Sequence, residues 1–300
     1  MRAFAEGVMA TESTPARDPA AFARSFSMEA TRPSAAEIAA LAELLAPGTP
    51  VYLPAVPTQH TRELIAAAAG LRKAGLEPVA HIAARRLSSA EQLHELLTGV
   101  RGEADMRRLL VIGGDVDSSG PFAEALAVIQ KGRLRESGIE EIGVAGYPEG
   151  HSRIAPDRLE AALDQKIAAA RAAGLRVHIV SQFSFAPAAV VGWLKRLRQC
   201  GIAVPVKVGM AGPTSLTALM RYAKRCGVNA SLRGLASGAA SGLLGNVGPD
   251  RILAGLATAG DIGEANPHYF SFGGVLQTAR YACDAAAGRL LADRAMAQPN

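Results

Sequence analysis

The chain alternates between short apolar runs and longer stretches in which apolar residues recur every three or four positions. Runs of the first kind predict buried strands, and stretches of the second kind predict amphipathic helices. The expected strands are Ser25 to Glu29, Val51 to Pro54, Pro78 to Ile82, Leu109 to Gly113, Glu141 to Gly146, Val177 to Gln182, Val204 to Gly209 and Tyr269 to Gly273. The expected helices are Ser34 to Leu45, Thr61 to Ala74, Ser88 to Val100, Phe122 to Arg135, Pro156 to Ala173, Pro187 to Cys200, Ser215 to Cys226 and Asp250 to Ala259.

Residues at the ends of these stretches support the helices. Ser34 and Ser89 each stand three residues before a Glu or Gln, which is close to a capping box. Gly75, Gly174 and Gly201 follow the last apolar positions of three helices, where glycine commonly ends a helix.

Eight strands that alternate with eight helices predict a closed parallel (βα)8 barrel, the TIM barrel. A doubly wound open sheet is the alternative, but the GxGxxG fingerprint of dinucleotide-binding sheets is absent. We expect residues 1–24 to be a loose extension and residues 25–300 to form one catalytic barrel domain. The Gly/Ala/Ser-rich stretch from Gly227 to Gly248 predicts two closely packed helices, with a mobile lid or a subunit contact as alternatives.

Composition limits the class of protein. The 300 residues are 49% hydrophobic and 20% charged, and the net charge of +5 comes without a basic run interleaved with aromatic residues. Nucleic-acid binding is therefore not expected. No apolar stretch reaches 18 residues and no secretory signal is present, so we expect neither membrane insertion nor export. Three cysteines without a CxxC pair argue against a disulfide framework and favour a cytoplasmic protein.

Polar side chains gather where the expected strands end, which is where a parallel barrel carries its chemistry. These residues are Glu29, His81, Asp115, Tyr147, Glu149, His151 and Gln182. Each also has a structural interpretation. Glu29 could pair with Arg32, His81 could be a core histidine, Asp115 could belong to a tight turn, and Gln182 could be a buried amide.

Other kinds of chemistry lack their motifs. No HxH follows the first strand and no HExxH occurs, so a metal site is not expected. No GxSxG elbow is present for a serine nucleophile.

Several segments resemble one family, the methylenetetrahydrofolate reductases of the short bacterial type that contain only the catalytic barrel. The segments are SMEATRP at Ser27, GGD at Gly113, GVAGYPEGH at Gly143, IVSQFSF at Ile179 and WLKRLRQCGIAVPVKVGMAGP at Trp193. They occur in the family's order, and Ser181 replaces the family's threonine in the fourth.

The resemblance implies a flavoenzyme that interconverts 5,10-methylenetetrahydrofolate and 5-methyltetrahydrofolate, with FAD as cofactor and NADH or NADPH as co-substrate. Glu29 then matches the catalytic acid, and Asp115 matches the aspartate beside flavin and pterin. The implied FAD contacts are His81, Gly113, Gly114, Asp115, Tyr147, His151 and Lys166. The implied contacts to tetrahydrofolate derivatives are Asp115, Gln182 and Phe185.

The chain also departs from the family. Pro54 replaces a flavin-contacting threonine, Gly113 replaces a common arginine, and HYFSFGG at His268 lacks the family's terminal asparagine and arginine. We therefore expect FAD to bind more loosely than in relatives. The sequence leaves open the physiological direction, the choice between NADH and NADPH, and a homo-oligomer. Two other functions also stay open: a folate-dependent one-carbon transferase, and a folate-binding partner subunit without redox activity.

Overall fold

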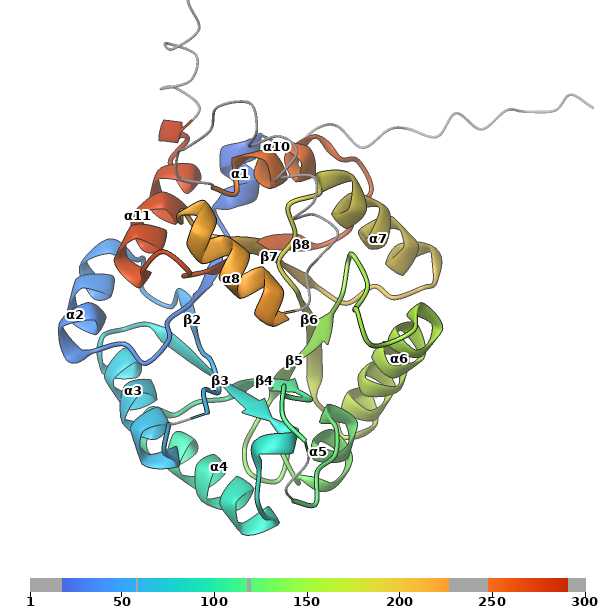
Figure 1. Cartoon of the computed structure of the whole chain (residues 1–300). Helices are drawn as coiled ribbons and strands as arrows, with labels where there is room; N and C mark the ends of the chain where they lie inside the picture. The colour runs from blue at the N-terminus through green and yellow to red at the C-terminus, as the bar shows by residue number, and fades with distance from the viewer. Residues whose placement is uncertain (1–17, 58, 118–119, 227–247, 291–300) are drawn as a thin grey trace, which may run out of the picture.

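The computed structural model describes residues 18–57, 59–117, 120–226 and 248–290. Its strands pair in chain order, and β1 closes the ring onto β8, so the sheet is a closed parallel barrel (Figure 1). The strands are β1 (Ser27–Glu29), β2 (Pro50–Leu53), β3 (Glu77–Ala83), β4 (Arg108–Ile112), β5 (Glu141–Gly146), β6 (Arg176–Ser181), β7 (Val206–Ala211) and β8 (Ala265–Phe270).

Helices surround this barrel (Figure 1). They are α1 (Pro19–Ala23), α2 (Ala35–Leu44), α3 (Thr61–Lys73), η1 (Ala84–Arg86), α4 (Ala90–Ala104), α5 (Ala125–Lys131), α6 (Pro156–Ala172), α7 (Pro187–Gln199), α8 (Leu216–Cys226), α10 (Asp250–Thr258) and α11 (Val275–Ala286). The predicted (βα)8 barrel is confirmed. The open-sheet alternative is excluded because Met28 of β1 is in register with Tyr269 of β8.

The strands carry apolar residues on both faces because the barrel buries both. Alternate residues such as Val51 and Leu53 belong to the large core between strands and helices. Tyr52 lies between them in sequence and points into the barrel, where it packs with Val79, Leu110 and Val180. This second, smaller cluster shares the barrel interior with buried polar side chains such as His81 and His178.

Local signals place the helix ends as the sequence predicted. Ser34 forms a complete capping box with Glu37. The side chain of Ser89 accepts a hydrogen bond from the backbone N–H of Gln92. Gly75, like Gly174 and Gly201, has a positive φ of 70–80°, which ends a helix at low steric cost.

The last strand differs from its prediction. We expected it at residues 269–273, but β8 spans Ala265–Phe270, and Ser271 to Gly274 form a turn. Pro267 lies inside the strand, which hid its start in the sequence. The prediction also missed α11, the helix that follows β8, because no element was predicted after residue 273.

The start of the chain also contains structure that was not expected. Residues 19–23, within the segment expected to be loose, form α1, which packs against α10, α11 and β8. Helix α5 is shorter than the predicted 122–135. Residues 1–17 and the stretch from 227 to 247, with its predicted small-residue helices, lie outside the described residues.

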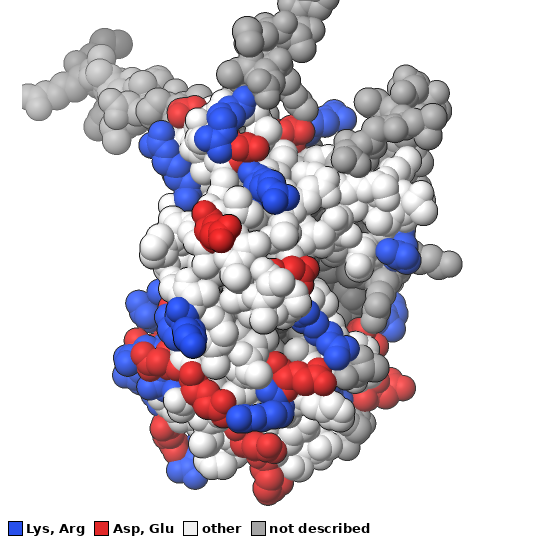
Figure 2. Space-filling model, turned by 90° about the vertical axis from the view of Figure 1, so that its left-hand side faces the viewer, with Lys and Arg blue, Asp and Glu red and all other residues white. Residues whose placement is uncertain are grey.

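Within the described ranges, no helix is both long and apolar enough to cross a membrane. On the face shown in Figure 2, acidic and basic side chains lie interspersed, and their lower band includes neighbours of both signs. That face carries no extended patch of a single charge.

Gly209 in β7 tests how tightly the strands approach each other below the barrel mouth. A Cβ at this position would lie 2.3 Å from the carbonyl oxygen of Ser181 and 2.8 Å from the ring of Phe270. We expect Gly209→Ala to lower the free energy of unfolding by about 1–3 kcal/mol through overpacking. Gly192→Ala in α7 is the matched control, because its Cβ would meet only Arg196 at 3.6 Å. This control should stabilise by up to about 1 kcal/mol in urea unfolding, and equal effects of both substitutions would contradict the packing.

Candidate active site at the barrel mouth

Glu29 ends β1, and the barrel wall buries its side chain. The ion pair with Arg32 that the sequence allowed does not form, because Arg32 pairs with Glu63 at 3.0 Å. Glu29 is therefore a buried carboxyl without an arginine or lysine partner among its ion pairs in the described structure.

Two imidazoles face this carboxyl. The Nε2 atoms of His81 and His268 lie 3.6 and 3.8 Å from Oε1 of Glu29. Both atoms are buried and have no hydrogen-bond partner among the described residues. Sequence reasoning found His81 but missed His268, because β8 was placed too late in the chain. Alternation along β8 was the available signal, since His268 and Phe270 share one face.

Burial decides the charge of this group. It raises the pKa of Glu29 to about 8 and lowers the pKa of His81 to about 3. The pKa of His268 is also well below its usual value, first because of burial and then because of Lys207. The contacts are therefore not ion pairs at neutral pH. A carboxylic acid that holds its proton stands beside two neutral imidazoles.

Tyr52 supports both imidazoles from inside the barrel. Its ring meets the ring of His268 edge-on at a centroid distance of 4.6 Å, and it meets the ring of His81 in the same way at 6.0 Å. Its hydroxyl lies 2.9 Å from Nε2 of His178, and Nδ1 of His178 lies 2.8 Å from Glu141. This column of polar contacts runs from the barrel interior to the opposite end of the sheet. No pattern in the sequence indicated it.

A second contact fixes His268. Its Nδ1 lies 2.9 Å from the hydroxyl of Ser27, which is fully buried two residues before Glu29 on the same strand. Alternation on β1 therefore points Ser27 and Glu29 to the same side, toward the barrel interior.

The loop after β4 carries Gly113, Gly114 and Asp115. Gly114 has φ 94°, a conformation that favours glycine. Asp115 is half exposed and forms an ion pair with Arg86 of η1. Arg85 donates to the carbonyl oxygens of Gly113 and Gly114 at 3.3 and 2.6 Å. The sequence indicated this loop but not the two arginines that hold it.

The end of β5 brings together the residues predicted there. The rings of Tyr147 and His151 meet edge-on at 5.4 Å. One carboxylate oxygen of Glu149 is buried without a hydrogen-bond partner among the described residues. Lys166 reaches back from α6 to within 3.5 Å of the carbonyl oxygen of Ala145, and burial lowers the pKa of its ammonium to about 8.

The end of β6 presents an amide and an aromatic cluster. Oε1 of Gln182 accepts a hydrogen bond from the backbone N–H of Phe183 at 3.1 Å. Ser181, which replaces the family's threonine, keeps a hydroxyl that accepts from the N–H of Gly209 at 2.8 Å. The ring of Phe183 meets those of three other phenylalanines, Phe185, Phe270 and Phe272. Of these three, only Phe185 was predicted as a site residue.

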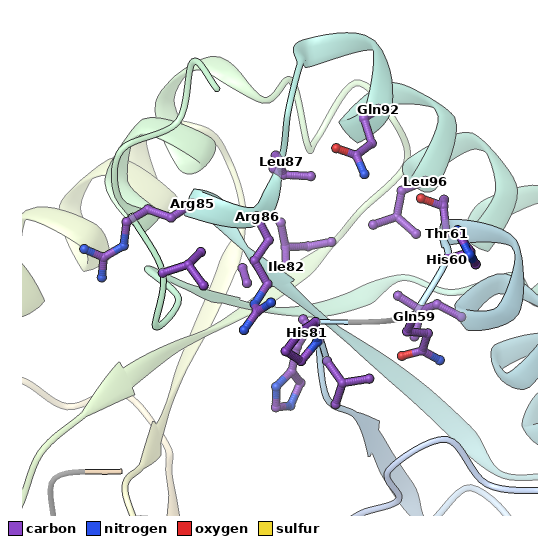
Figure 3. A pocket seen from close by; sticks show the side chains of 16 residues that line it. Gln59, His60, Thr61, His81, Ile82, Arg85, Arg86, Leu87, Gln92 and Leu96 are labelled. Carbon is purple, nitrogen blue, oxygen red and sulfur yellow. The ribbon is translucent and has the colours of Figure 1, made fainter. Parts of the chain in front are cut away.

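A cavity of about 310 Å³ adjoins this mouth beside the ends of β2 and β3 (Figure 3). Its polar lining includes Gln59, His60, Thr61, His81, Arg86 and Gln92. Because His81 lines the cavity and also faces Glu29, the cavity lies next to the buried carboxyl. In the part of the chain that the structure describes, no three His, Cys, Asp or Glu side chains gather in a way that could hold a metal ion.

Comparison with known proteins identifies the relatives of this chain. A sequence model of the family described as methylenetetrahydrofolate reductase matches residues 48–232. The chain belongs to the methylenetetrahydrofolate reductase family. Membership makes it a folate-related oxidoreductase, and it supports an enzyme that acts on methylenetetrahydrofolate. The matched residues include Asp115, Lys166 and Gln182, whereas Glu29 and His268 lie outside them.

Solved structures of other barrels are similar at a distance. The dihydropteroate synthase from Thermus thermophilus is 16% identical, with a TM-score of 0.46 over 89% of this chain and 93% of that one. A putative phosphonomutase from Burkholderia cenocepacia is 15% identical, with a TM-score of 0.48 over 93% of this chain and 98% of that one. At sequence identities and TM-scores this low, these similarities carry no information about the function of this chain.

The raised pKa of Glu29 predicts a pH-dependent stability. Between about pH 4.5 and 8 the folded protein holds the proton on Glu29 and the unfolded chain does not, so this group's contribution falls as the pH rises through that window. We expect the unfolding free energy of the wild type minus that of Glu29→Gln, measured in urea titrations, to decrease from pH 5 to pH 9.

Glu141→Gln is the control for this measurement. The contact with Nδ1 of His178 at 2.8 Å lowers the pKa of Glu141 to about 2. The stability that Glu141 contributes is therefore complete above about pH 4.5 and is lost only in acid. Its difference from wild type should stay constant from pH 5 to 9. A constant difference for Glu29→Gln as well would show that the Glu29 carboxyl is not protonated at neutral pH.

Proposed function

We propose that this protein is a flavin-dependent oxidoreductase that interconverts 5,10-methylenetetrahydrofolate and 5-methyltetrahydrofolate, with Glu29 as the general acid. The observation that carries the proposal is the burial of the Glu29 carboxyl beside two imidazoles at the mouth of a barrel from this family, and this burial raises its pKa to about 8. Because Glu29 lies outside the residues that match the family, its role rests on this geometry.

The reaction needs a proton at one defined atom. Reduction of the methylene bridge requires the five-membered ring to open, and the departing nitrogen must be protonated. A carboxylic acid with a pKa of about 8 carries that proton at neutral pH and can release it to a nitrogen held against it. The neutral imidazoles of His81 and His268 surround the acid without drawing it into an ion pair.

Residues at the ends of β4 and β6 would contact the folate. The carboxylate of Asp115 would stabilise positive charge on the pterin. The amide oxygen of Gln182 is held by the N–H of Phe183, which leaves its nitrogen free of that bond and able to donate to the pterin. The ring of Phe185, next to Phe183, offers a surface on which an aromatic part of the folate can pack.

The residues expected to hold FAD fit such a group. The buried Nε2 of His81 has no hydrogen-bond partner among the described residues. Gly113 and Gly114 carry no side chains of their own, and the guanidinium of Arg85 lies beside them as a donor. Lys166, whose ammonium is largely desolvated, and the pair of Tyr147 and His151 would complete the site. When bound, FAD supplies the hydride transfer, and NADH or NADPH supplies or receives its electrons.

A partner subunit that only binds folate is less well supported. Burying a carboxyl without a cation costs stability, and a binding function gives no reason for that cost. We also propose a cytoplasmic location, which the free and exposed thiol of Cys200 supports because such thiols suit a reducing compartment.

Glu29→Gln separates the two half-reactions. We expect the methylenetetrahydrofolate rate to fall by about 10²-fold or more, because the amide cannot donate the proton that ring opening needs. Flavin reduction by the nicotinamide donor should persist, since that step uses no proton at the folate nitrogen. Stopped-flow absorbance at the flavin band measures both rates. Glu103→Gln, in an exposed ion pair with Arg62, serves as the control. An undiminished folate rate would remove Glu29 from its role.

FAD affinity tests the cofactor assignment. Pro54 follows β2 and has no hydroxyl, and Gly113 has no side chain, so one or two hydrogen bonds worth about 1 kcal/mol each would be missing compared with relatives. We expect apo-protein to bind FAD in a fluorescence titration, and Pro54→Thr to bind it about tenfold more tightly. If folate turned over with a nicotinamide donor although no FAD bound, hydride would pass directly to folate and the proposed mechanism would fail.

A further inference from the structure

Two consecutive arginines on η1 hold the loop that follows β4. The backbone N–H of Arg85 donates to the carbonyl oxygen of Gly113 at 3.0 Å, and its side chain donates to the same oxygen and to that of Gly114. Arg86 forms an ion pair with the carboxylate of Asp115. The arginines therefore fix both the backbone and the acidic side chain of one loop at the barrel mouth.

The first arginine explains a departure in the sequence. A Cβ on Gly113 would lie 3.2 Å from a terminal nitrogen of Arg85, so a larger residue at 113 would displace that side chain. The family that the sequence resembles commonly has an arginine at this position. In this chain a guanidinium from the neighbouring β3 end occupies the adjoining space instead.

The second arginine changes the charge that the mouth presents. The side chain of Arg86 is 17% exposed and that of Asp115 is 52% exposed, so the cation is the more enclosed partner. In Figure 3 Arg86 points from η1 toward His81, whereas Arg85 extends in another direction, and both residues line the cavity. Arg85, Arg86 and Asp115 together carry a formal charge of +1, where Asp115 by itself would carry −1.

We propose that Arg86 is a positioning residue that holds the carboxylate of Asp115 at the barrel mouth and offsets its charge. The effect of Arg86 on a bound flavin rests on the proposed function. Reduced flavin is anionic, so a site whose aspartate is neutralised favours electron uptake more than a site with an unpaired aspartate. Arg86 thereby biases a bound flavin toward accepting hydride from folate, the direction that the sequence left open.

The ion pair is tested first without any ligand. In ¹⁵N NMR of the guanidinium groups of the purified protein, the Arg86 signal should shift on Asp115→Asn and keep its position on Glu136→Gln, which breaks the exposed pair of Arg133. The Arg133 signal should show the reverse pattern. An Arg86 signal that does not respond to Asp115→Asn overturns the inference, whatever the protein binds.

The consequence is tested by the midpoint potential of the FAD-loaded protein. Arg86→Gln should lower the potential by an amount equal to about a tenfold change in the ratio of reduced to oxidised flavin, or about 30 mV for two electrons. Asp115→Asn should raise it, the double variant should return close to wild type, and Arg86→Lys should stay near wild type because the charge is kept. A potential that is unchanged in Arg86→Gln contradicts the electrostatic role.

The two failures are distinguishable. If the protein takes up no FAD, the proposed function fails, and the NMR signal of Arg86 still decides whether this residue holds Asp115. If FAD binds and folate turns over, but the Arg86 signal keeps its position on Asp115→Asn, the proposed function survives and the inference is wrong.

Discussion

Burial of the Glu29 carboxyl against neutral partners, rather than against a cation, sets the charge state of the groups at this barrel mouth. A carboxyl buried beside lysine or arginine would ionise and could no longer donate a proton. Here the buried neighbours at 3.6 and 3.8 Å are imidazoles whose own burial keeps them neutral. The same desolvation therefore sets the protonation of all three groups, and it exists only because the closed barrel and its helices exclude water.

Polar groups inside a barrel are stable only if other polar groups there pair with them, because an unpaired buried polar group costs free energy. Tyr52 packs against both imidazoles and reaches His178, which reaches Glu141 at the far end of the sheet. Gly143 makes room for this column, since a Cβ there would lie 2.8 Å from Nε2 of His178. Buried polar side chains thus take up part of the barrel interior that apolar packing would otherwise fill.

The opposite side of the mouth is ordered in a different way. Asp115 lies on a solvent-accessible loop, where burial cannot fix its position, so direct contacts must. The arginines of η1 supply those contacts through backbone carbonyls and through the carboxylate. One side of the site is therefore ordered by desolvation and the other by charge pairing. This difference is consistent with the proposed roles of Glu29 as proton donor and Asp115 as charge-stabilising carboxylate.

The sequence by itself determined the barrel, most strand positions and the residues at the ends of β1, β3, β4, β5 and β6. These features depend on periodicity, caps and turns, which are local properties of the chain. It did not determine the start of β8, because proline is uncommon inside strands and Pro267 argued against one there. His268 was missed for the same reason. The partners of Glu29, Asp115 and Tyr52 were also decided only in three dimensions. Those partners come from strands and loops distant in sequence, and only closure of the ring brings them together and removes the water that would otherwise set their charge.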